Sequence, residues 1–196
     1  MIQKTLILVC LAVFTLLFVM MFLNMKNWYA ILPIPPVNQF ELARYVDWVP
    51  FSSQSGGFDV EFPVVPQHFN ENKADNQGTL LNYDMYVAQS VENTTYLISL
   101  ITFPNKAFLG NPEQMMETTI HELATATPSG RLVEQHKISY LNQVTVEFQF
   151  ETDTQETRGR IFIIDRTLYL LTAIFEKGQY KNEDYSYFVN SFQLIK

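Results

Sequence analysis

The sequence predicts an α+β fold in which an antiparallel sheet of about six or seven strands carries helices packed on its surface. Three observations lead to this class. Short runs rich in β-branched and aromatic residues alternate with a period of two between turn signals. Two other segments have the spacing of amphipathic helices. Aromatic residues make up 14% of the chain, a share that favours strands over disorder. Such elements bury their apolar faces against each other in one domain.

Seven segments have the strand pattern. The first, residues 58–62, alternates strictly and ends at Pro63, which cannot continue a ladder of hydrogen bonds. The others span residues 80–89, 95–103, 131–140, 143–152, 157–165 and 168–175. Short polar connections join the last four, so we expect them to form a meander of antiparallel hairpins. The stretch that precedes Gly57 is expected to hold a short helix or an edge segment followed by a loop.

Two helices are predicted from their start signals and apolar stripes. The first starts at Asn111, which is a good N-cap residue, and Pro112 follows at the first helical position. The second is expected near the C-terminus with Asn182 as its N-cap. Apolar residues recur at helical spacing in both segments, at Met116, Ile120 and Leu123 in the first and at Tyr185, Phe188, Val189 and Phe192 in the second.

Residues 1–23 are predicted to form a transmembrane anchor. Residues 5–23 are a run of 19 without a charge, a Gly or a Pro. A helix of that length spans about 28 Å, close to a bilayer core of roughly 30 Å. A cleaved signal peptide is the alternative, but its apolar region is usually about 7–15 residues long and a small-residue cleavage site follows it. The anchor residues include Thr5, Leu6, Phe14, Leu17, Phe22 and Leu23, and Trp28 and Tyr29 suit the far membrane interface.

Residues 24–47 are predicted to be a Pro-rich juxtamembrane linker, because Pro33, Pro35 and Pro36 favour an extended spacer. Residues 48–196 then form the folded domain. A short N-terminal tail on the inside and an aromatic belt at the other interface favour an extracytoplasmic domain, in the periplasm or at the cell exterior. The expected partners are the lipid bilayer and a protein in the same membrane or periplasm.

Composition excludes several classes of function. The chain has 13 Lys and Arg against 20 Asp and Glu, and a net charge of −7, which is the wrong sign for electrostatic binding of nucleic acid. Its single Cys cannot form an internal disulfide or a zinc site with two thiolates. We therefore expect no nucleic-acid partner, no metal and no other cofactor.

Few residues have the spacing that catalysis requires. His121 and Glu122 resemble the start of a zinc-peptidase helix, but position 125 is Thr and the second imidazole is lacking. The sequence has two pairs of acids, Glu147 with Glu151 and Glu183 with Asp184. Their spacing along the chain does not distinguish the two carboxylates of a glycosidase from acids on a solvent-exposed surface. Arg158 and Arg160 could clamp an anion, but pairing with acids on a neighbouring strand is the simpler expectation. We predict no catalytic residue.

Several features together resemble the PsbP-like superfamily. They are residues 57–63 followed by Pro66, the strand that ends at Pro104, the middle helix, the strand with Gly159–Phe162, and the ending 188–194. The family includes the extrinsic protein of photosystem II, a Ran-binding nuclear import factor and many small bacterial lipoproteins or anchored proteins. The resemblance implies an α/β/α sandwich around an antiparallel sheet that serves mainly to bind or stabilise partners. This chain departs from it in having a full anchor in place of a clear lipobox.

The function predicted from these features is a non-enzymatic, membrane-anchored, extracytoplasmic binding or assembly module. A small-molecule or lipid carrier, or a small hydrolase that uses carboxylates on the sheet face, are the alternatives. A carrier needs an apolar cavity beneath a helix, and a hydrolase needs facing carboxylates with a raised pKa. The aromatic residues that could contact a partner are Trp48, Tyr83, Tyr86 and Tyr96.

Overall fold

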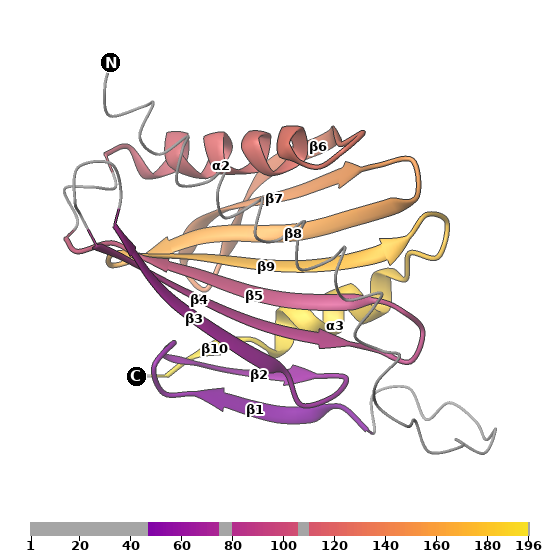
Figure 1. Cartoon of the computed structure of the whole chain (residues 1–196), viewed down its shortest axis with the longest axis horizontal. Coiled ribbons are helices and arrows are strands. Elements are labelled where there is room, and N and C mark those ends of the chain that lie inside the picture. Colours follow the sequence, from indigo (N-terminus) through magenta and orange to yellow (C-terminus); the bar gives the residue numbers. More distant parts are fainter. Residues whose placement is uncertain (1–46, 75–79, 106–109, 196) are drawn as a thin grey trace.

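The computed structural model describes residues 47–74, 80–105 and 110–195. Its largest element is a seven-stranded antiparallel sheet with the strand order β3-β4-β5-β9-β8-β7-β6 (Figure 1). The strands are β3 (Gln67–Ala74), β4 (Leu80–Gln89), β5 (Thr95–Thr102), β6 (Arg131–Tyr140), β7 (Gln143–Glu151), β8 (Gln155–Ile164) and β9 (Thr167–Glu176). The six strands predicted for this sheet are confirmed to within two residues at their ends, and β6 to β9 form the expected meander.

A second, three-stranded sheet packs against the first. It contains β1 (Val49–Ser53), β2 (Phe58–Phe62) and β10 (Gln193–Leu194) in the order β1-β2-β10. The predicted strand 58–62 is confirmed, although it belongs to this small sheet and not to the large one. Its alternate residues Phe58, Val60 and Phe62 are buried against the large sheet. Of the two structures expected before Gly57, residues 49–53 adopt the edge strand.

Helix α2 (Pro112–Ala126) begins where the sequence predicts. The side-chain oxygen of Asn111 accepts hydrogen bonds from the backbone N–H groups of Glu113, at 3.0 Å, and Gln114, at 3.2 Å. These two bonds satisfy donors that have no partner inside the helix. The predicted apolar stripe of Met116, Ile120 and Leu123 is buried, so α2 packs as expected.

Helix α3 (Asn182–Ser191) has the predicted buried stripe but a different start. The prediction that Asn182 is the N-cap is wrong, because Lys181 occupies that position and makes no side-chain capping bond. The Asn182 side-chain oxygen instead accepts a hydrogen bond from the Tyr180 hydroxyl at 2.8 Å. The side-chain oxygen that an N-cap would use to accept backbone N–H groups is therefore bonded to the Tyr180 hydroxyl instead.

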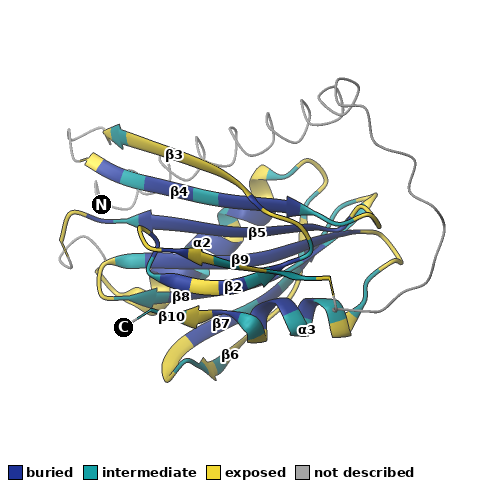
Figure 2. Cartoon of the chain, turned by 90° about the horizontal axis from the view of Figure 1, so that it is seen from below, coloured by how far each residue is buried: buried dark blue, intermediate teal, exposed yellow. Residues whose placement is uncertain are grey.

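The two faces of the large sheet are covered differently. The face that we call the α3 face packs against α3 and the small sheet, and its core includes Tyr86, Tyr96 and Leu171. The opposite face, the α2 face, packs part of its surface against α2 through Ile101, Phe148 and Leu170. The burial colours in Figure 2 show that central strands β5 and β9 are mainly buried. The core therefore lies on both sides of one sheet.

Strand β3 is an element that the sequence analysis did not find. It forms one edge of the large sheet, and every residue in it except Lys73 is exposed (Figure 2). Its sequence, QHFNENKA, has one large apolar residue, Phe69, and no apolar alternation. An edge strand of this kind is held by backbone pairing with its neighbour, which leaves no hydrophobic signal in the sequence.

Candidate functional site

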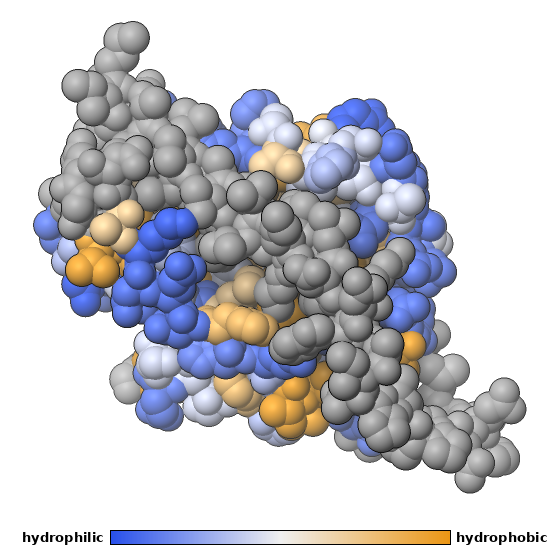
Figure 3. Space-filling model, viewed as in Figure 1, coloured by the Kyte–Doolittle hydropathy of each residue, from blue (hydrophilic) through white to orange (hydrophobic). Residues whose placement is uncertain are grey.

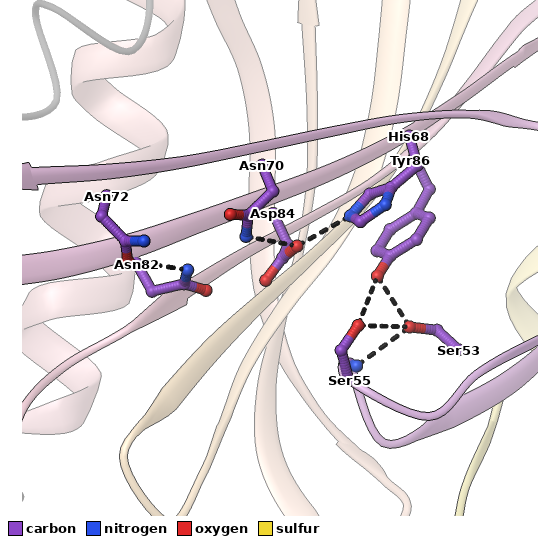
Figure 4. Close-up of polar contacts among 9 residues, drawn as sticks. Ser53, Ser55, His68, Asn70, Asn72, Asn82, Asp84 and Tyr86 are labelled. Atoms are coloured by element: carbon purple, nitrogen blue, oxygen red, sulfur yellow. Dashed lines mark hydrogen bonds and ion pairs between the residues drawn. The ribbon is translucent and has the colours of Figure 1, made fainter.

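The candidate site is a polar cluster on the α3 face where β3 pairs with β4 (Figure 4). Three pairs of residues face each other across the two strands: His68 with Tyr86, Asn70 with Asp84, and Asn72 with Asn82. We call these six residues the edge cluster. Residues directly opposite on antiparallel strands share one face of the sheet, so the cluster is a continuous row of imidazole, amide and carboxylate groups.

Asp84 is the centre of the edge cluster. Its carboxylate oxygen Oδ1 accepts a hydrogen bond from the Asn70 amide at 2.8 Å and lies 2.8 Å from Nε2 of His68. Asp84 is only 6% exposed, whereas the His68 side chain is 42% exposed. A nearly buried carboxylate with two polar partners is held in one orientation. His68 and Asn70 are thereby fixed at the sheet edge.

The cluster continues inward through Tyr86. The His68 ring stacks on the Tyr86 ring, with centroids 4.3 Å apart and planes 2° from parallel. The Tyr86 hydroxyl lies 2.7 Å from the hydroxyl of Ser53, at the end of β1, and 3.3 Å from that of Ser55, in the β1–β2 connection. Ser53 also accepts the N–H of Gly56 at 2.9 Å. These contacts tie the edge strand to the small sheet.

The arrangement orients polar groups and does not assemble an activated nucleophile. A serine nucleophile needs a histidine base within hydrogen-bond reach and an acid behind that base. Here the two serine hydroxyls bond to the Tyr86 hydroxyl, while His68 bonds to Asp84. Serine and histidine therefore belong to separate hydrogen-bond networks.

A second polar cluster lies on the α3 face, nearer to β6 and α3, and its centre is Glu147. Arg160 Nε donates to this carboxylate at 2.8 Å, as expected for a cross-strand pair. His136 Nε2 lies 3.2 Å from the other oxygen, Oε2, whereas the Tyr185 hydroxyl donates at 3.3 Å to Oε1, the oxygen that Arg160 also contacts. Burial and the Glu147 charge raise the pKa of the Tyr185 phenol. This cluster fastens α3 to the sheet.

The other carboxylates that the sequence analysis singled out are also engaged or exposed. Glu151 pairs with Arg131 and lies 3.4 Å from Lys177. Its hydrogen bond from Arg131, followed by the one from Lys177, lowers the pKa of this carboxyl, which is the opposite of what a general acid needs. Glu183 and Asp184 lie in the first turn of α3, where negative charge is favourable.

Three of the four predicted partner-binding aromatics lie in or against one core cluster on the α3 face, and the fourth lies on the opposite face of the sheet. Tyr86 and Tyr96 are buried in the core of the α3 face, and Tyr83 is buried on the α2 face. Trp48 is half-buried and packs edge-on against Tyr96 and Tyr187, with centroid distances of 5.1 Å to each. The residues thus line no common groove, and their contact with a partner stays a prediction.

His121 lies exposed on α2, beside Glu122. Both carboxylate oxygens of Glu122 are shielded from solvent and have no hydrogen-bond partner among the described residues. Desolvation raises the pKa of this carboxyl, partly offset by His121. No group of three His, Cys, Asp or Glu side chains that could hold a metal occurs in residues 47–74, 80–105 and 110–195.

A surface hollow lies at the N-terminal end of α2, between that helix, β7 and the β8–β9 turn. Its lining mixes polar residues such as Asn111 and Asp165 with Met116, Val144 and Ile163. The hollow is broadly open to solvent, unlike the enclosed apolar cavity that a carrier needs.

The predicted membrane anchor, with Thr5, Leu6, Phe14, Leu17, Phe22 and Leu23, and the interfacial Trp28 and Tyr29 lie outside the described residues. Within the part of the chain that the structure does describe, no helix is long and apolar enough to cross a membrane. The anchor and the extracytoplasmic location therefore stay predictions.

Comparison with solved structures decides the fold. The chain is similar to the solution structure of cyanobacterial PsbP (CyanoP) from Synechocystis sp. PCC 6803, with a TM-score of 0.52 and 10% sequence identity. The match covers 82% of this chain and 99% of that chain. The domain has a PsbP-like fold. The resemblance seen in the sequence is confirmed at this level, and identity this low shows the fold alone. No family model matches the PsbP-like chain, and no curated sequence matches it either.

Proposed function

We propose that this PsbP-like chain is a non-enzymatic, membrane-anchored, extracytoplasmic module that binds a protein partner along the β3 edge. The observation that carries the proposal is that β3 is an open edge strand next to an ordered row of polar side chains. The predicted anchor and the Pro-rich linker support the location, because they would hold the domain near a bilayer. Hydrogen-bonding groups without an activated nucleophile support binding over catalysis.

The two edges of the large sheet differ in how well they could accept another strand. The β6 edge has a register shift between Leu132 and Glu134, and α2 lies against it, with Lys137 of β6 bonded to Glu113 of α2 at 2.6 Å. Bulges and covering elements are devices that block edge pairing. Strand β3 pairs with β4 in unbroken register over all eight residues, and no described strand pairs with its other side. This edge can therefore accept an extended segment.

The side chains of β3 would give such a segment specificity. His68, Asn70 and Asn72 point to the α3 face, and Phe69 and Glu71 lie on the other face of the strand. In strand addition, main-chain hydrogen bonds supply affinity, and alternate side chains select the sequence. Amide and imidazole groups held by Asp84 favour a partner strand with polar residues on one face.

Photo-crosslinking in native membranes tests this proposal. A photoreactive residue at Glu71 on β3 should give one protein adduct in the membrane fraction, whereas the same residue at Glu134 on β6 should give none. Asn72→Lys places a charge beside the partner strand and should reduce the Glu71 adduct severalfold. Mass spectrometry of the adduct should also recover the original N-terminus. Equal amounts of adduct at both edges would contradict binding along β3. A mature chain that begins near Ile31 would contradict the anchor.

A further inference from the structure

Part of the α2 face has an apolar surface on which no described element packs. Helix α2 makes its close contacts with β6, β7 and β8. The remaining area, on β4, β5 and β9, contains Val87, Leu97 and Ile174, with Met85 packed against them. These residues form a cluster without a member from either helix or from the small sheet. We call the surface of these four residues the apolar platform.

The apolar platform differs from the rest of the core because no described element covers it. Val87 is 6% exposed, Leu97 1% and Ile174 6%, and buried apolar residues of a sheet face need a second layer. The other face has α3 and the small sheet for this purpose (Figure 1). Figure 3 shows hydrophobic atoms in the middle of this side of the molecule, with hydrophilic ones to the left and below. The described elements thus leave this part of the large sheet without a second layer to cover it.

Small residues would let that missing layer approach closely. Ser99 and Thr172 lie on the same face as the platform and are buried, at 3% and 6% exposure. Gly159, opposite Thr172 at the next position across the sheet, is already covered by the Phe148 ring, so the uncovered area ends there. Small side chains allow the backbone of a packed helix to come near. Ser99 and Thr172 therefore leave room for the backbone of an apolar helix beside the platform.

An unpaired acid stands on the flank of α2 that faces away from β6. Glu113 and Glu117 lie on the β6 flank, where both pair with Lys137, at 2.6 and 3.4 Å. Glu122 is about half a helical turn around the axis from Glu113, on the side of the platform. Its two carboxylate oxygens are shielded and have no partner among the described residues. Such an acid needs a cation or a donor, so the missing layer should bring a basic group.

One segment of this chain has the required chemistry. Residues 5–23 are an uncharged apolar run, and Lys4 and Lys26 flank it. As a helix it would be about 28 Å long, enough to cross five strands spaced about 4.8 Å apart. Residues 24–46 connect it to the domain and can span up to about 75 Å when extended. The segment can therefore reach the platform from the start of β1.

We propose that, where no bilayer accepts it, the Thr5–Leu23 segment docks on the apolar platform with a flanking lysine, Lys4 or Lys26, paired with Glu122. The platform and the bilayer then compete for the same apolar segment. Docking shields that segment before insertion, and insertion exposes the platform. This inference goes beyond the anchor role and does not depend on binding at the β3 edge.

The single Cys of the chain, Cys10, lies within the docking segment and provides the test. The full chain carries one added thiol at a platform position, Met85→Cys, Leu97→Cys or Ile174→Cys, and is oxidised in aqueous buffer without lipid. At least one variant should form an intramolecular disulfide with Cys10. The control Asp59→Cys, exposed on β2 of the opposite side, should form none. Vesicles of phosphatidylcholine and phosphatidylglycerol should suppress the disulfide.

Substitution of the acid separates specific docking from loose hydrophobic contact. Glu122→Gln should reduce the disulfide yield about tenfold, as expected for loss of a shielded charged pair. Glu113→Gln on the other flank of α2 should leave the yield unchanged. The proposal would be overturned by equal disulfide yields for the platform variants and the Asp59 variant, or by a disulfide that forms only between two chains. It would also be overturned if Glu122→Gln did not change the disulfide yield. Vesicle binding without any disulfide would leave the anchor intact and reject the docking site alone.

Discussion

Tyr140 shows how a single side chain can join two layers of this domain. It lies at the end of β6, its hydroxyl donates to the backbone carbonyl of Val189 in α3, and the Arg160 guanidinium lies 4.8 Å from its ring centre. Burial raises the pKa of the phenol to about 12, and Arg160 opposes this shift. The fold thus favours the neutral phenol, which is the form that can donate the hydrogen bond.

This hydrogen bond should give the domain a measurable response to base. The unfolded phenol has a pKa of about 10, and the folded value is raised. The stability that Tyr140 contributes is therefore complete below pH 10 and is lost as the pH rises through about 12. Tyr140→Phe should cost about 0.5–1.5 kcal/mol at pH 8, and this difference should shrink as the pH approaches 12. Urea unfolding of both proteins at several pH values measures it, and a constant difference would contradict the prediction.

At the scale of single residues, the sequence predicts two kinds of contact. They are contacts between residues close together in the chain, and contacts between residues that the strand register places opposite each other. Asn111 caps α2 because the cap signal is local, and Arg160 meets Glu147 because the meander fixes which residues lie opposite. The edge cluster has no such signal. His68 stacks on Tyr86 through the β3–β4 pairing, which no hydrophobic pattern reveals, and Ser53 reaches Tyr86 because the small sheet folds back onto β4, a contact that no spacing along the chain encodes.

Among the elements, α3 is held in place by its buried aromatic stripe. Phe188 is fully buried and contacts Phe62 of β2 and Tyr96 of β5, with centroid distances of 5.5 and 5.2 Å. Tyr185 and Phe192 continue the same buried side. The stripe therefore connects α3 to both sheets at once, and it is core rather than an exposed docking surface.

Phe188→Ala should consequently cost about 3–5 kcal/mol of unfolding free energy, as for other large buried aromatics. Asn190→Ala, two residues further along α3 and exposed, should change it by no more than about 0.5 kcal/mol. Denaturant unfolding of both variants provides the comparison. A near-neutral Phe188→Ala would mean that α3 does not pack on the sheets in solution.

The elements also differ in how far the sequence predicts them. Strands β4, β5 and β9 have apolar residues that are buried on both faces of the sheet, and β2 alternates because only one of its faces is buried. Strand β3 is predicted by neither pattern, since its residues face solvent and its pairing uses backbone groups. The candidate binding edge is thus the element with the least hydrophobic signal, as expected where a surface is kept for contact instead of packing.

At the scale of the whole domain, the small sheet, α3 and the α3 face of the large sheet share one core. Phe58 of β2 packs with Tyr86 of β4 and Phe192 after α3, at centroid distances of 5.2 Å for each pair. The β10 strand, which follows α3 directly, pairs with β2 and closes this arrangement. The N-terminal and C-terminal parts of the domain therefore depend on each other for burial.

This shared core predicts that the domain unfolds in a single cooperative step. In a fragment that starts at Asn38, Trp48 is the only Trp, and it packs between Tyr96 of the large sheet and Tyr187 of α3. Its fluorescence reports the junction of the layers, while far-ultraviolet circular dichroism reports mainly the large sheet. Because neither sheet can lose its partner without exposing the same aromatic core, the two signals should give the same denaturant midpoint. An earlier midpoint for Trp48 would show that the small sheet and α3 detach first, and that the large sheet is stable without them.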